Sequence, residues 1–476
     1  MNLYENLAEQ VKVDIRHGLY ALGERLPSVR RLSDQQRVSP ASVVAAYRLL
    51  ESQGWLEARP QSGFYARHPE AMPPAAARSH CDDSPCAVSV TELALRLSRN
   101  SQRKDLVSFG AAVPHPDLLP LKDLRAVMVR TLRDHDDVGS RYSFPPGEEP
   151  LRLAIARRAA EWGGRIGPDD IVITDGCQEG LNLALRAVAQ AGDIIAIESP
   201  AFFGTLQAIE SLGLQALEIP SDPETGISLE ALSLALDRWP IKAVAVVSNF
   251  SNPTGSLMPD EHKARLVKLL AARAIPLIED DIYGDLAHGR ERPRAAKAYD
   301  RDGNVLLCAS FSKTVAPGYR VGWVVPGRYR RMLEHLKYVG TMGNATLPQL
   351  ALAAYLNDSR YERHLARVRR VYADNLARVQ AAINRYFPPG TRTSRPAGGF
   401  VLWVELPEGC DSMVLYDKAL AAGISFTPGR MFSPREKYGN CLRLAAALPW
   451  DARVEAALVE LGRLAGRLTG KLARRS

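Results

Sequence analysis

The chain has 476 residues, which is too long for one small domain and predicts two or three domains. Its 46% hydrophobic and 24% charged residues are typical of a globular protein with a sizeable core, and it lacks a run of about 18 apolar residues, so no membrane span is expected. The net charge of +8 permits nucleic-acid binding without demonstrating it. Residues 1–67 hold nine Lys and Arg against seven Asp and Glu, so the positive excess is not concentrated there.

The start of the chain and its cysteines bear on the cellular compartment. Residues 1–5 are neither basic and then apolar nor rich in Arg and Ser, so no export or transit signal is expected. Six cysteines are too few and too scattered for a disulfide framework. Cys81 and Cys86 have no second pair at metal-ligand spacing. We therefore expect free thiols, no metal site and a cytoplasmic location.

Apolar spacing predicts two helices at the start of the chain. Apolar residues recur every four positions and predict a helix over about 3–17, which Gly18 and Gly23 end. Ser28 is a suitable cap for a second helix over about 29–36. The residues expected to face inward from these helices and the next are Leu7, Val11, Ile15, Val43, Ala46, Tyr47 and Leu50.

A third helix and a hairpin follow. Ser39 and Pro40 form a tight turn, with Pro40 at the first position of a helix that runs to about residue 53. Residues 55–58 and 63–66 then predict a two-stranded hairpin. Three short helices and a hairpin are typical of a winged helix-turn-helix.

In such a unit the second helix of the turn enters the major groove of DNA with its first residues at the base edges. Short side chains there permit close approach, arginines can meet phosphates or guanine edges, and the hairpin backbone can enter the minor groove. The residues expected to contact DNA are Arg25, Ser28, Arg30, Ser39, Ala41, Ser42, Ser62 and Gly63. The pattern alone leaves open a packed helical subdomain whose arginines are merely solvated.

Residues 3–67 closely resemble the GntR-type winged helix. The matching motifs are Gly23-x-Arg25-Leu26-Pro27-Ser28-x-Arg30, Val38-Ser39, Ala46-Tyr47-x-Leu49-Leu50 and the stretch 54–63. The resemblance implies binding of double-stranded operator DNA. The family usually has Ser or Thr, Arg and Thr near the start of the reading helix, where this chain has Pro40-Ala41-Ser42, so the base preference is not carried over.

After the head, the pattern changes twice. Residues 68–100 are loose and polar and predict a linker, within which 91–99 has helical character. From about residue 101, strand-like apolar runs alternate with helical patterns, which predicts a mostly parallel α/β sheet within a domain over 101–476. The expected strands are 171–174, 194–197, 243–247, 275–278 and 305–307.

Polar residues after these strands have the parts of a site for an aldehyde cofactor. The amine of Lys313 can form a Schiff base, after which a pyridinium ring withdraws electrons from the attached carbon. Asp280 can keep the ring nitrogen protonated, Asn252 can donate to the ring oxygen, and Phe202 offers a stacking face. Tyr283 lies on the turn after Asp280.

A phosphate site is expected at the turn 176–180, which opens a helix over about 181–189, because the free amides and dipole of a helix N-terminus suit an anion. The residues expected around the phosphate are Cys177, Gln178, Ser310, Ser312 and Arg320. Each piece alone is weak, since an Asp after a strand is usually a helix cap and such turns are frequent in α/β proteins.

Together, in this order, the motifs resemble fold-type I aminotransferases over about 105–465. The motifs are the phosphate turn, Phe202, Asn252-Pro253-Thr254-Gly255, Asp280-x-x-Tyr283, Ser310-x-Ser312-Lys313 and Arg320. The resemblance implies pyridoxal 5'-phosphate bound by a Schiff base at Lys313, with Asp280 at the ring nitrogen and Asn252 and Tyr283 at the ring oxygen. It also implies a large α/β domain with a smaller α+β domain.

The same resemblance assigns two further residues. Tyr142 matches the tyrosine that reaches the phosphate of the neighbouring subunit, which implies a homodimer with composite sites. Arg443 matches the arginine that grips a substrate carboxylate, although on its own it reads as an ordinary strand-end arginine. The chain departs from the usual pattern at Cys177, which replaces Ser, Thr or Ala, and at Phe202, which stands where Tyr is frequent.

A GntR-type head fused to this fold resembles the MocR subfamily of regulators. Three hypotheses follow: a regulator that senses pyridoxal phosphate or an amino-group effector, a working aminotransferase with a secondary head, and a DNA-binding module whose second domain serves only for dimerisation. An enzyme does not need the head, and a mere dimeriser does not need Lys313 with all its supports. The first is therefore favoured. Because Asn252-Pro253-Thr254-Gly255 and Arg443 match the motifs of working aminotransferases, we also expect weak transamination activity beside the regulatory function.

Overall fold

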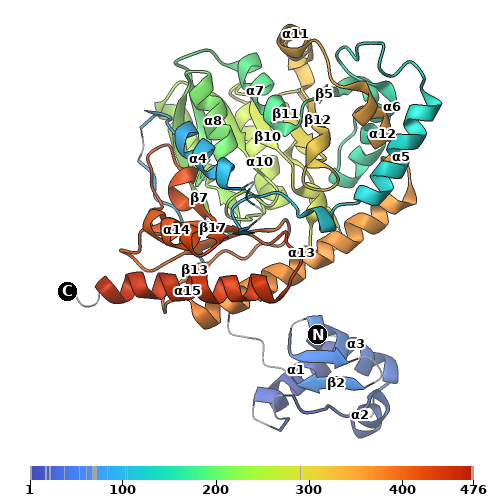
Figure 1. Cartoon of the computed structure of the whole chain (residues 1–476), viewed down its shortest axis with the longest axis vertical. Helices are drawn as coiled ribbons and strands as arrows, with labels where there is room; N and C mark the ends of the chain where they lie inside the picture. Colours follow the sequence, from blue (N-terminus) through green and yellow to red (C-terminus); the bar gives the residue numbers. More distant parts are fainter. Residues whose placement is uncertain are drawn as a thin grey trace. The chain divides into compact units, whose positions relative to one another are not determined.

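A computed structural model of the chain describes residues 3–472, apart from 17, 18, 21, 22, 37, 53, 60, 61, 67–71, 83, 102, 104 and 290. The chain divides into two compact units, Met1–Pro73 and Pro74–Ser476. Figure 1 colours the first unit dark blue and runs from lighter blue to red through the second. Residues 17, 18, 53 and 67–71, on which several predicted boundaries fall, lie outside the described residues.

The first unit is the predicted winged helix-turn-helix. Its described elements are α1 (Leu3–Arg16), α2 (Val29–Gln36), α3 (Pro40–Ser52), β1 (Leu56–Arg59) and β2 (Gly63–Ala66), with β1 and β2 antiparallel. Both predicted caps form, because the Arg31 amide donates to Ser28 Oγ at 3.3 Å and the Ser42 amide donates to Ser39 Oγ at 3.1 Å. All the residues expected to face inward are buried in one core cluster.

The structure differs from the prediction of a linker over residues 68–100. From Pro74 onward it belongs to the second unit. There β3 (Cys86–Ala87) pairs antiparallel with β7 (Gln215–Asp222), and α4 (Thr91–Ser101) packs Ala94 into a core cluster. Backbone pairing at a sheet edge and small buried side chains leave little apolar periodicity in a sequence, and for that reason the stretch resembled a linker.

A nine-stranded sheet forms the centre of the second unit, in the order β3-β7-β6-β9-β10-β11-β12-β5, with β8 (Gly226–Ile227) paired to β7. The other strands are β5 (Val172–Thr174), β6 (Ile194–Ser199), β9 (Ile241–Val246), β10 (Leu277–Asp280), β11 (Val305–Ser310) and β12 (Gly322–Val325). β7, β6, β9, β10 and β11 run parallel, while β12 is antiparallel to both of its neighbours. The predicted mostly parallel α/β sheet is confirmed.

Helices cover both faces of this sheet. Along β6, Ile195 and Ile197 pack in the cluster that includes α7 (Cys177–Val188) and α8 (Phe203–Ser211). Ala196, which points the other way, packs in the cluster that includes α9 (Leu229–Arg238) and α10 (Asp260–Ala271). Strands with two buried faces account for the uninterrupted apolar runs seen in the sequence. The remaining helices around the sheet are α5 (Leu121–Asp134), α6 (Glu149–Arg158), α11 (Arg330–Thr341) and α12 (Thr346–Leu356).

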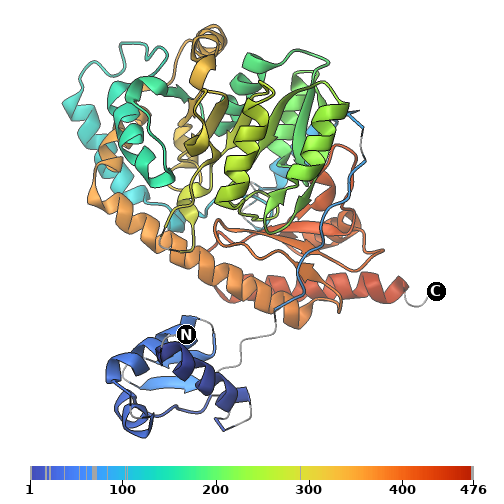
Figure 2. The same cartoon turned by 180° about the vertical axis from the view of Figure 1, so that it is seen from behind.

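A smaller α+β part completes the second unit. Its four-stranded sheet has the order β13 (Arg392–Thr393), β14 (Val401–Glu405), β17 (Cys441–Ala445) and β16 (Thr427–Pro428), and β15 (Ile424–Ser425) pairs with β4 (Val107–Ser108). The long helix α13 (Ser359–Tyr386) lies beside α15 (Ala452–Leu472), as both views show (Figure 1 and Figure 2), and α14 (Ser412–Ala421) packs with them. In the part of the chain described, every helix is too short or too polar to traverse a lipid bilayer.

Candidate functional site

The structure brings the expected cofactor residues to one cavity of about 310 Å³ beside the ends of β9, β10 and β11. The carboxyl ends of parallel strands are the usual place for a ligand site in an α/β sheet. The predicted residues that line the cavity are Cys177, Gln178, Phe202, Asn252, Asp280, Tyr283, Ser310, Ser312, Lys313, Arg320 and Arg443.

Lys313 lies three residues after the end of β11 and points its amine into this cavity, where Nζ donates to the carbonyl oxygen of Ala112 at 2.6 Å. Burial lowers the pKa of Lys313 to about 8, the positive charge of Arg443 acts in the same direction, and Asp280 opposes them. The neutral amine is the form that attacks a carbonyl carbon. The surroundings of Lys313 therefore favour its reactive form.

Asp280 is the last residue of β10 and is 4% exposed. Its Oδ1 accepts hydrogen bonds from the Ile282 amide at 3.1 Å and from the Cys177 thiol at 3.5 Å. Burial raises the pKa of Asp280 to about 6. A cation beside this carboxylate would offset the cost of keeping it charged, so the site suits a protonated ring nitrogen.

Several buried polar atoms of the cavity have no hydrogen-bond partner within the described chain. They are Asn252 Oδ1, Tyr283 OH, and Nε and Nη1 of Arg443. Native structures leave few such atoms unpaired, because each costs about 1–3 kcal/mol. Arg443 is 1% exposed, and its Nη2 donates to the Gly110 carbonyl and to Thr427 Oγ1. These atoms fit a polar group with several acceptors and donors bound in the cavity.

The turn expected to hold a phosphate is built for close approach. α7 begins at Cys177, four residues before the predicted start, so the first free amides of the helix lie within the turn itself. Gly176 has φ +80°, and a Cβ there would lie 2.5 Å from Nη2 of Arg320. That same Nη2 donates to the Asp175 carbonyl at 2.8 Å. The amides and the guanidinium together form a cradle suited to an anion.

Other residues of the cradle have more than one role. Gln178 Nε2 donates to the Gly204 carbonyl at 2.7 Å, which leaves the backbone amide of Gln178 as its group for a phosphate. The Ser312 amide donates to Ser310 Oγ at 3.3 Å. Phe202 is half-buried, with its ring centroid 5.0 Å from that of Phe203.

Tyr142 is not among the residues that line the cavity. It is 69% exposed, and its ring stacks on Phe144 with centroids 5.5 Å apart. Phe144 in turn lies 5.9 Å from the ring of Tyr338, which is 50% exposed. These three residues, the aromatic patch, lie on the surface of the second unit. The role expected for Tyr142 requires a second copy of the chain.

Some cavity residues were not expected from the sequence. Ala112 and Gly110 act through their carbonyl oxygens, which leave no trace in side-chain chemistry. Thr427 accepts a hydrogen bond from Arg443 Nη2, but it lies in no motif recognised in the sequence. Ala94 and Leu97 line the cavity from α4, within the segment that was expected to be a linker. An amphipathic pattern over 91–99 was the available signal for them.

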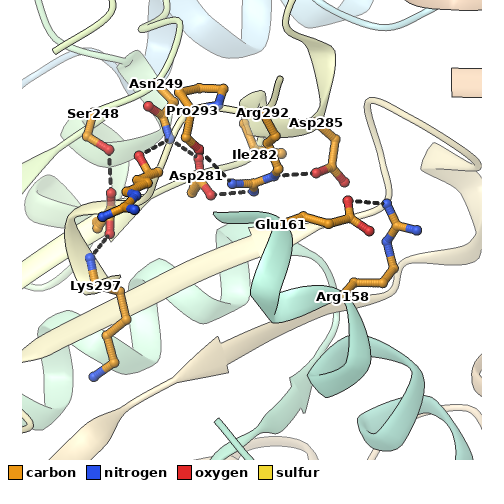
Figure 3. Close-up of polar contacts among 12 residues, drawn as sticks. Arg158, Glu161, Ser248, Asn249, Asp281, Ile282, Asp285, Arg292, Pro293 and Lys297 are labelled. Carbon is orange, nitrogen blue, oxygen red and sulfur yellow. Dashed lines mark hydrogen bonds and ion pairs between the residues drawn. The ribbon is translucent and has the colours of Figure 1, made fainter. Parts of the chain in front are cut away.

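Buried ion pairs on either side of Tyr283 hold the turn that follows Asp280. Figure 3 shows Arg292 between two carboxylates, with its Nη2 2.6 Å from Asp281 Oδ2 and its Nε 2.5 Å from Asp285 Oδ1. Asn249 Nδ2 donates to the other oxygen of Asp281 at 2.8 Å. Asp281 follows Asp280 directly, so these contacts fix the end of β10.

In the first unit, the residues expected at DNA lie around α2, α3 and the start of β2. Arg25, Ser28, Arg30, Ser39 and Ala41 are exposed, and Ser42, Ser62 and Gly63 are partly exposed. Ser28 and Ser39 also cap their helices. A Cβ on Gly63 would lie 3.2 Å from Arg25 Nε, which places that arginine against the hairpin.

Comparison with known proteins agrees with this architecture. The family described as aminotransferase class I and II matches residues 115–461, and the family described as bacterial regulatory proteins, gntR family, matches residues 3–66. YdcR of Escherichia coli (strain K12), named an uncharacterized HTH-type transcriptional regulator, is 41% identical over 466 residues, or 98% of this chain and 99% of its own. YjiR of the same strain, named likewise, is 39% identical over 462 residues, with 97% and 98% covered.

A solved aminotransferase shares the fold of the second unit. LysN, an α-aminoadipate aminotransferase from Thermus thermophilus solved with N-(5'-phosphopyridoxyl)-L-leucine, has a TM-score of 0.72 and 29% identity, covering 80% of this chain and 100% of LysN. The fit of the cavity residues and the family match agree on the cofactor. The chain therefore belongs to the aminotransferase class I and II family and, through its GntR-type DNA-binding head, to the MocR subfamily of transcriptional regulators, with pyridoxal 5'-phosphate as its cofactor.

Proposed function

We propose that the chain is a transcription regulator that binds operator DNA with its first unit and holds pyridoxal 5'-phosphate at Lys313 in its second. It responds to the cofactor or to an amino compound that reacts with it. The meeting of Lys313, Asp280 and the unpaired donors of Arg443 in one cavity carries this proposal. The full-length likeness to HTH-type transcriptional regulators supports it.

Each of the cavity residues predicted from the sequence has a role in this proposal. Lys313 would hold the cofactor covalently, Asp280 would face its ring nitrogen, and Asn252 and Tyr283 would contact its ring oxygen. Phe202 would lie against the ring. When bound, the cofactor supplies an electron sink for the amino compound attached to it. Asp280 helps by keeping a positive charge at the ring nitrogen, since a buried carboxylate favours a neighbouring cation.

The phosphate would lie in the cradle at the start of α7. The backbone amides of Cys177 and Gln178 and the hydroxyls of Ser310 and Ser312 would donate to its oxygens. Arg320, held beside Gly176, would supply the positive charge. A helix N-terminus with an arginine is well suited to a dianion.

Arg443 would bind the carboxylate of an amino compound. Its Nε and Nη1 are buried and unpaired within the described chain, while Nη2 is fixed by Gly110 and Thr427. A carboxylate would satisfy the free donors and remove the cost of burying them. The same arrangement favours a second candidate function, weak aminotransferase activity on the bound amino compound.

We further propose that two copies of the chain form a homodimer. The aromatic patch of Tyr142, Phe144 and Tyr338 leaves large apolar side chains exposed on a protein surface, which is typical of an interface. With a second copy over this patch, Tyr142 of one copy would reach the phosphate cradle of the other. Each site would then be composite. Binding of a ligand could then change how the two DNA-binding heads are held, and so change operator affinity.

In the first unit, α3 would enter the major groove with Ser39, Ala41 and Ser42 at its leading end. Arg25, Ser28 and Arg30 would contact the backbone or guanine edges, and Ser62 and Gly63 would approach the minor groove. Residues 1–67 would act as the DNA-binding domain and 101–476 as the cofactor-binding domain. Of the stretch between them, the part from Pro74 belongs to the second unit.

Two measurements test the proposal together. Purified wild-type protein is expected to carry a visible absorption band that is lost in Lys313→Ala. Footprinting on the chain's own upstream region is expected to give sequence-selective protection that weakens in Arg30→Ala. A wild type without a band, even after adding the cofactor, contradicts the cofactor site. A band with no selective protection and with turnover of an amino donor at about 1 per second or faster favours a working enzyme instead.

A further inference from the structure

The cavity has a second, apolar part beyond the groups assigned to the cofactor. Its side chains are Ala94, Leu97, Phe203, Tyr416, Phe426 and Met431. Leu97 packs against two core clusters, one with Ala94 and Met431 and the other with Tyr416 and Phe426. These residues therefore form one continuous apolar wall, and α4 contributes Ala94 and Leu97 to it.

The charged groups of the cavity limit what can lie against this wall. Among the described lining residues the charged side chains are Asp280, Lys313, Arg320 and Arg443. In the proposed function the first three serve the cofactor, so Arg443 alone remains for a ligand charge. One guanidinium can pair with one carboxylate. A second carboxylate or a distal ammonium on the ligand has no oppositely charged partner left among these residues, and burying a charge without one is strongly unfavourable.

We infer that the amino compound is a neutral α-amino acid with an apolar or aromatic side chain. Its carboxylate lies at Arg443, and its side chain packs against the wall formed by Leu97, Phe203 and Met431. This inference rests on the proposed attachment of the cofactor at Lys313. It also gives α4 a role, because α4 is the first helix after residues 74–90, which lead from the DNA-binding head. A ligand against Leu97 touches the segment joined to that head.

The test is a spectral titration of the wild-type holoprotein that follows the shift of the visible band. The probes are L-leucine, L-methionine and L-phenylalanine, compared with L-glutamate and L-lysine. The apolar amino acids are expected to half-saturate the shift at concentrations about tenfold lower or more, because a buried unpaired charge is a strong discriminator. Amines without a carboxylate, such as phenethylamine, are expected to bind more weakly than L-phenylalanine.

Variants of α4 test whether Leu97 contacts the ligand as part of the apolar wall. Leu97→Arg places a cation in the apolar wall. It is expected to weaken the binding of L-phenylalanine about tenfold and to strengthen the binding of L-glutamate. Leu95→Arg is the matched control, because Leu95 lies on the same helix, is 55% exposed and does not line the cavity. It is expected to titrate like wild type. Leu97→Ala adds no charge, so it is expected to weaken the binding of L-phenylalanine without strengthening that of L-glutamate. It replaces Leu97→Arg in the test if Leu97→Arg does not fold.

The outcomes separate the inference from the proposed function. A missing visible band in wild type removes the proposed function itself. A normal band that L-glutamate or L-lysine shifts at the same or lower concentration than L-leucine overturns the inference alone, as does a band that none of the five amino acids shifts. Equal behaviour of the Leu97 and Leu95 variants would overturn the assignment of α4 to the ligand wall.

Discussion

Arg292 Nη2 lies 2.6 Å from Asp281 Oδ2, with only 8% and 1% of the two side chains exposed. The same guanidinium also pairs with Asp285, on the other side of Tyr283. One cation therefore joins the two ends of the turn that carries Asp280 and Tyr283 into the cavity. Partners of this kind restrict the rotamers and backbone of the groups that face a ligand.

We predict that Arg292→Met strongly destabilises the second unit. Removing one partner of a buried ion pair costs about 3–5 kcal/mol, and here both Asp281 and Asp285 lose the cation that contacts them. The free energy of unfolding in urea measures this loss. Arg265→Met is the control, because the side chains of Arg265 and Glu230 are 59% and 75% exposed and such pairs contribute about 1 kcal/mol or less. Equal losses in the two variants would contradict the importance of the buried cluster.

Gly176→Ala is expected to abolish tight cofactor binding. The new Cβ would lie 2.5 Å from Arg320 Nη2, so the arginine must leave the phosphate cradle. Gly192→Ala is the matched control, because Gly192 also has positive φ, +90°, but nothing lies within 4 Å of its Cβ position. Both variants also lose about 1–3 kcal/mol of stability, because a residue with a Cβ is strained at positive φ. Cofactor titration followed by absorbance is expected to separate them, and equal affinities would argue against a cradle at Gly176.

The pKa of Lys313 sets the pH dependence of cofactor attachment to the apoprotein. Because burial and Arg443 lower this pKa to about 8, the neutral amine becomes the main form as the pH rises through 8. The rate at which the visible band appears after mixing is expected to rise with pH and to level off above that midpoint. In Arg443→Gln the midpoint should move upward, since a positive charge is lost. A midpoint near the ordinary lysine value would contradict burial of the amine.

Asp280 is expected to make the apoprotein less stable as the pH rises from about 4 to 6. Its pKa is raised by burial to about 6 in the folded chain, so the folded state binds a proton that the unfolded state has already released. The stabilisation present below the unfolded pKa, about 3 kcal/mol at most, is lost as the pH passes the folded value. Unfolding curves at several pH values should show a smaller fall in Asp280→Asn than in wild type, because the pKa values of Glu198 and Glu279 are also raised by burial and both variants keep those contributions.

The elements and cavity residues that could be predicted from the sequence depend on local patterns. α2 has the bounds that its cap and spacing indicated, because a serine cap and apolar periodicity act within one helix. Lys313, Asp280 and Asn252 were recognisable because each lies at or after the end of a buried strand, and parallel strands end at one edge of a sheet. Their meeting in a single cavity follows from that topology.

What the sequence did not reveal depends on contacts between distant segments. Arg292 reaches Asp281 from a loop without a motif, and Ala112 accepts from Lys313 through its backbone. The sequence placed the start of α7 too late, at residue 181, because residues 176–180 were taken as the turn before the helix. Gly180 has a packing reason to be within the helix, because a Cβ there would lie only 3.0 Å from Val324.

In the DNA-binding head, Arg30→Ala is expected to weaken operator binding and to make it less dependent on salt. Arg30 is an exposed cation on α2, the helix before the reading helix α3, where a phosphate contact is expected. Losing one such contact reduces the slope of the logarithm of affinity against the logarithm of salt by about 1. Lys12→Ala is the control, because Lys12 lies on α1 and pairs with Glu9 at 3.0 Å. Filter binding at several salt concentrations measures both variants, and an unchanged slope for Arg30→Ala would place Arg30 away from the phosphates.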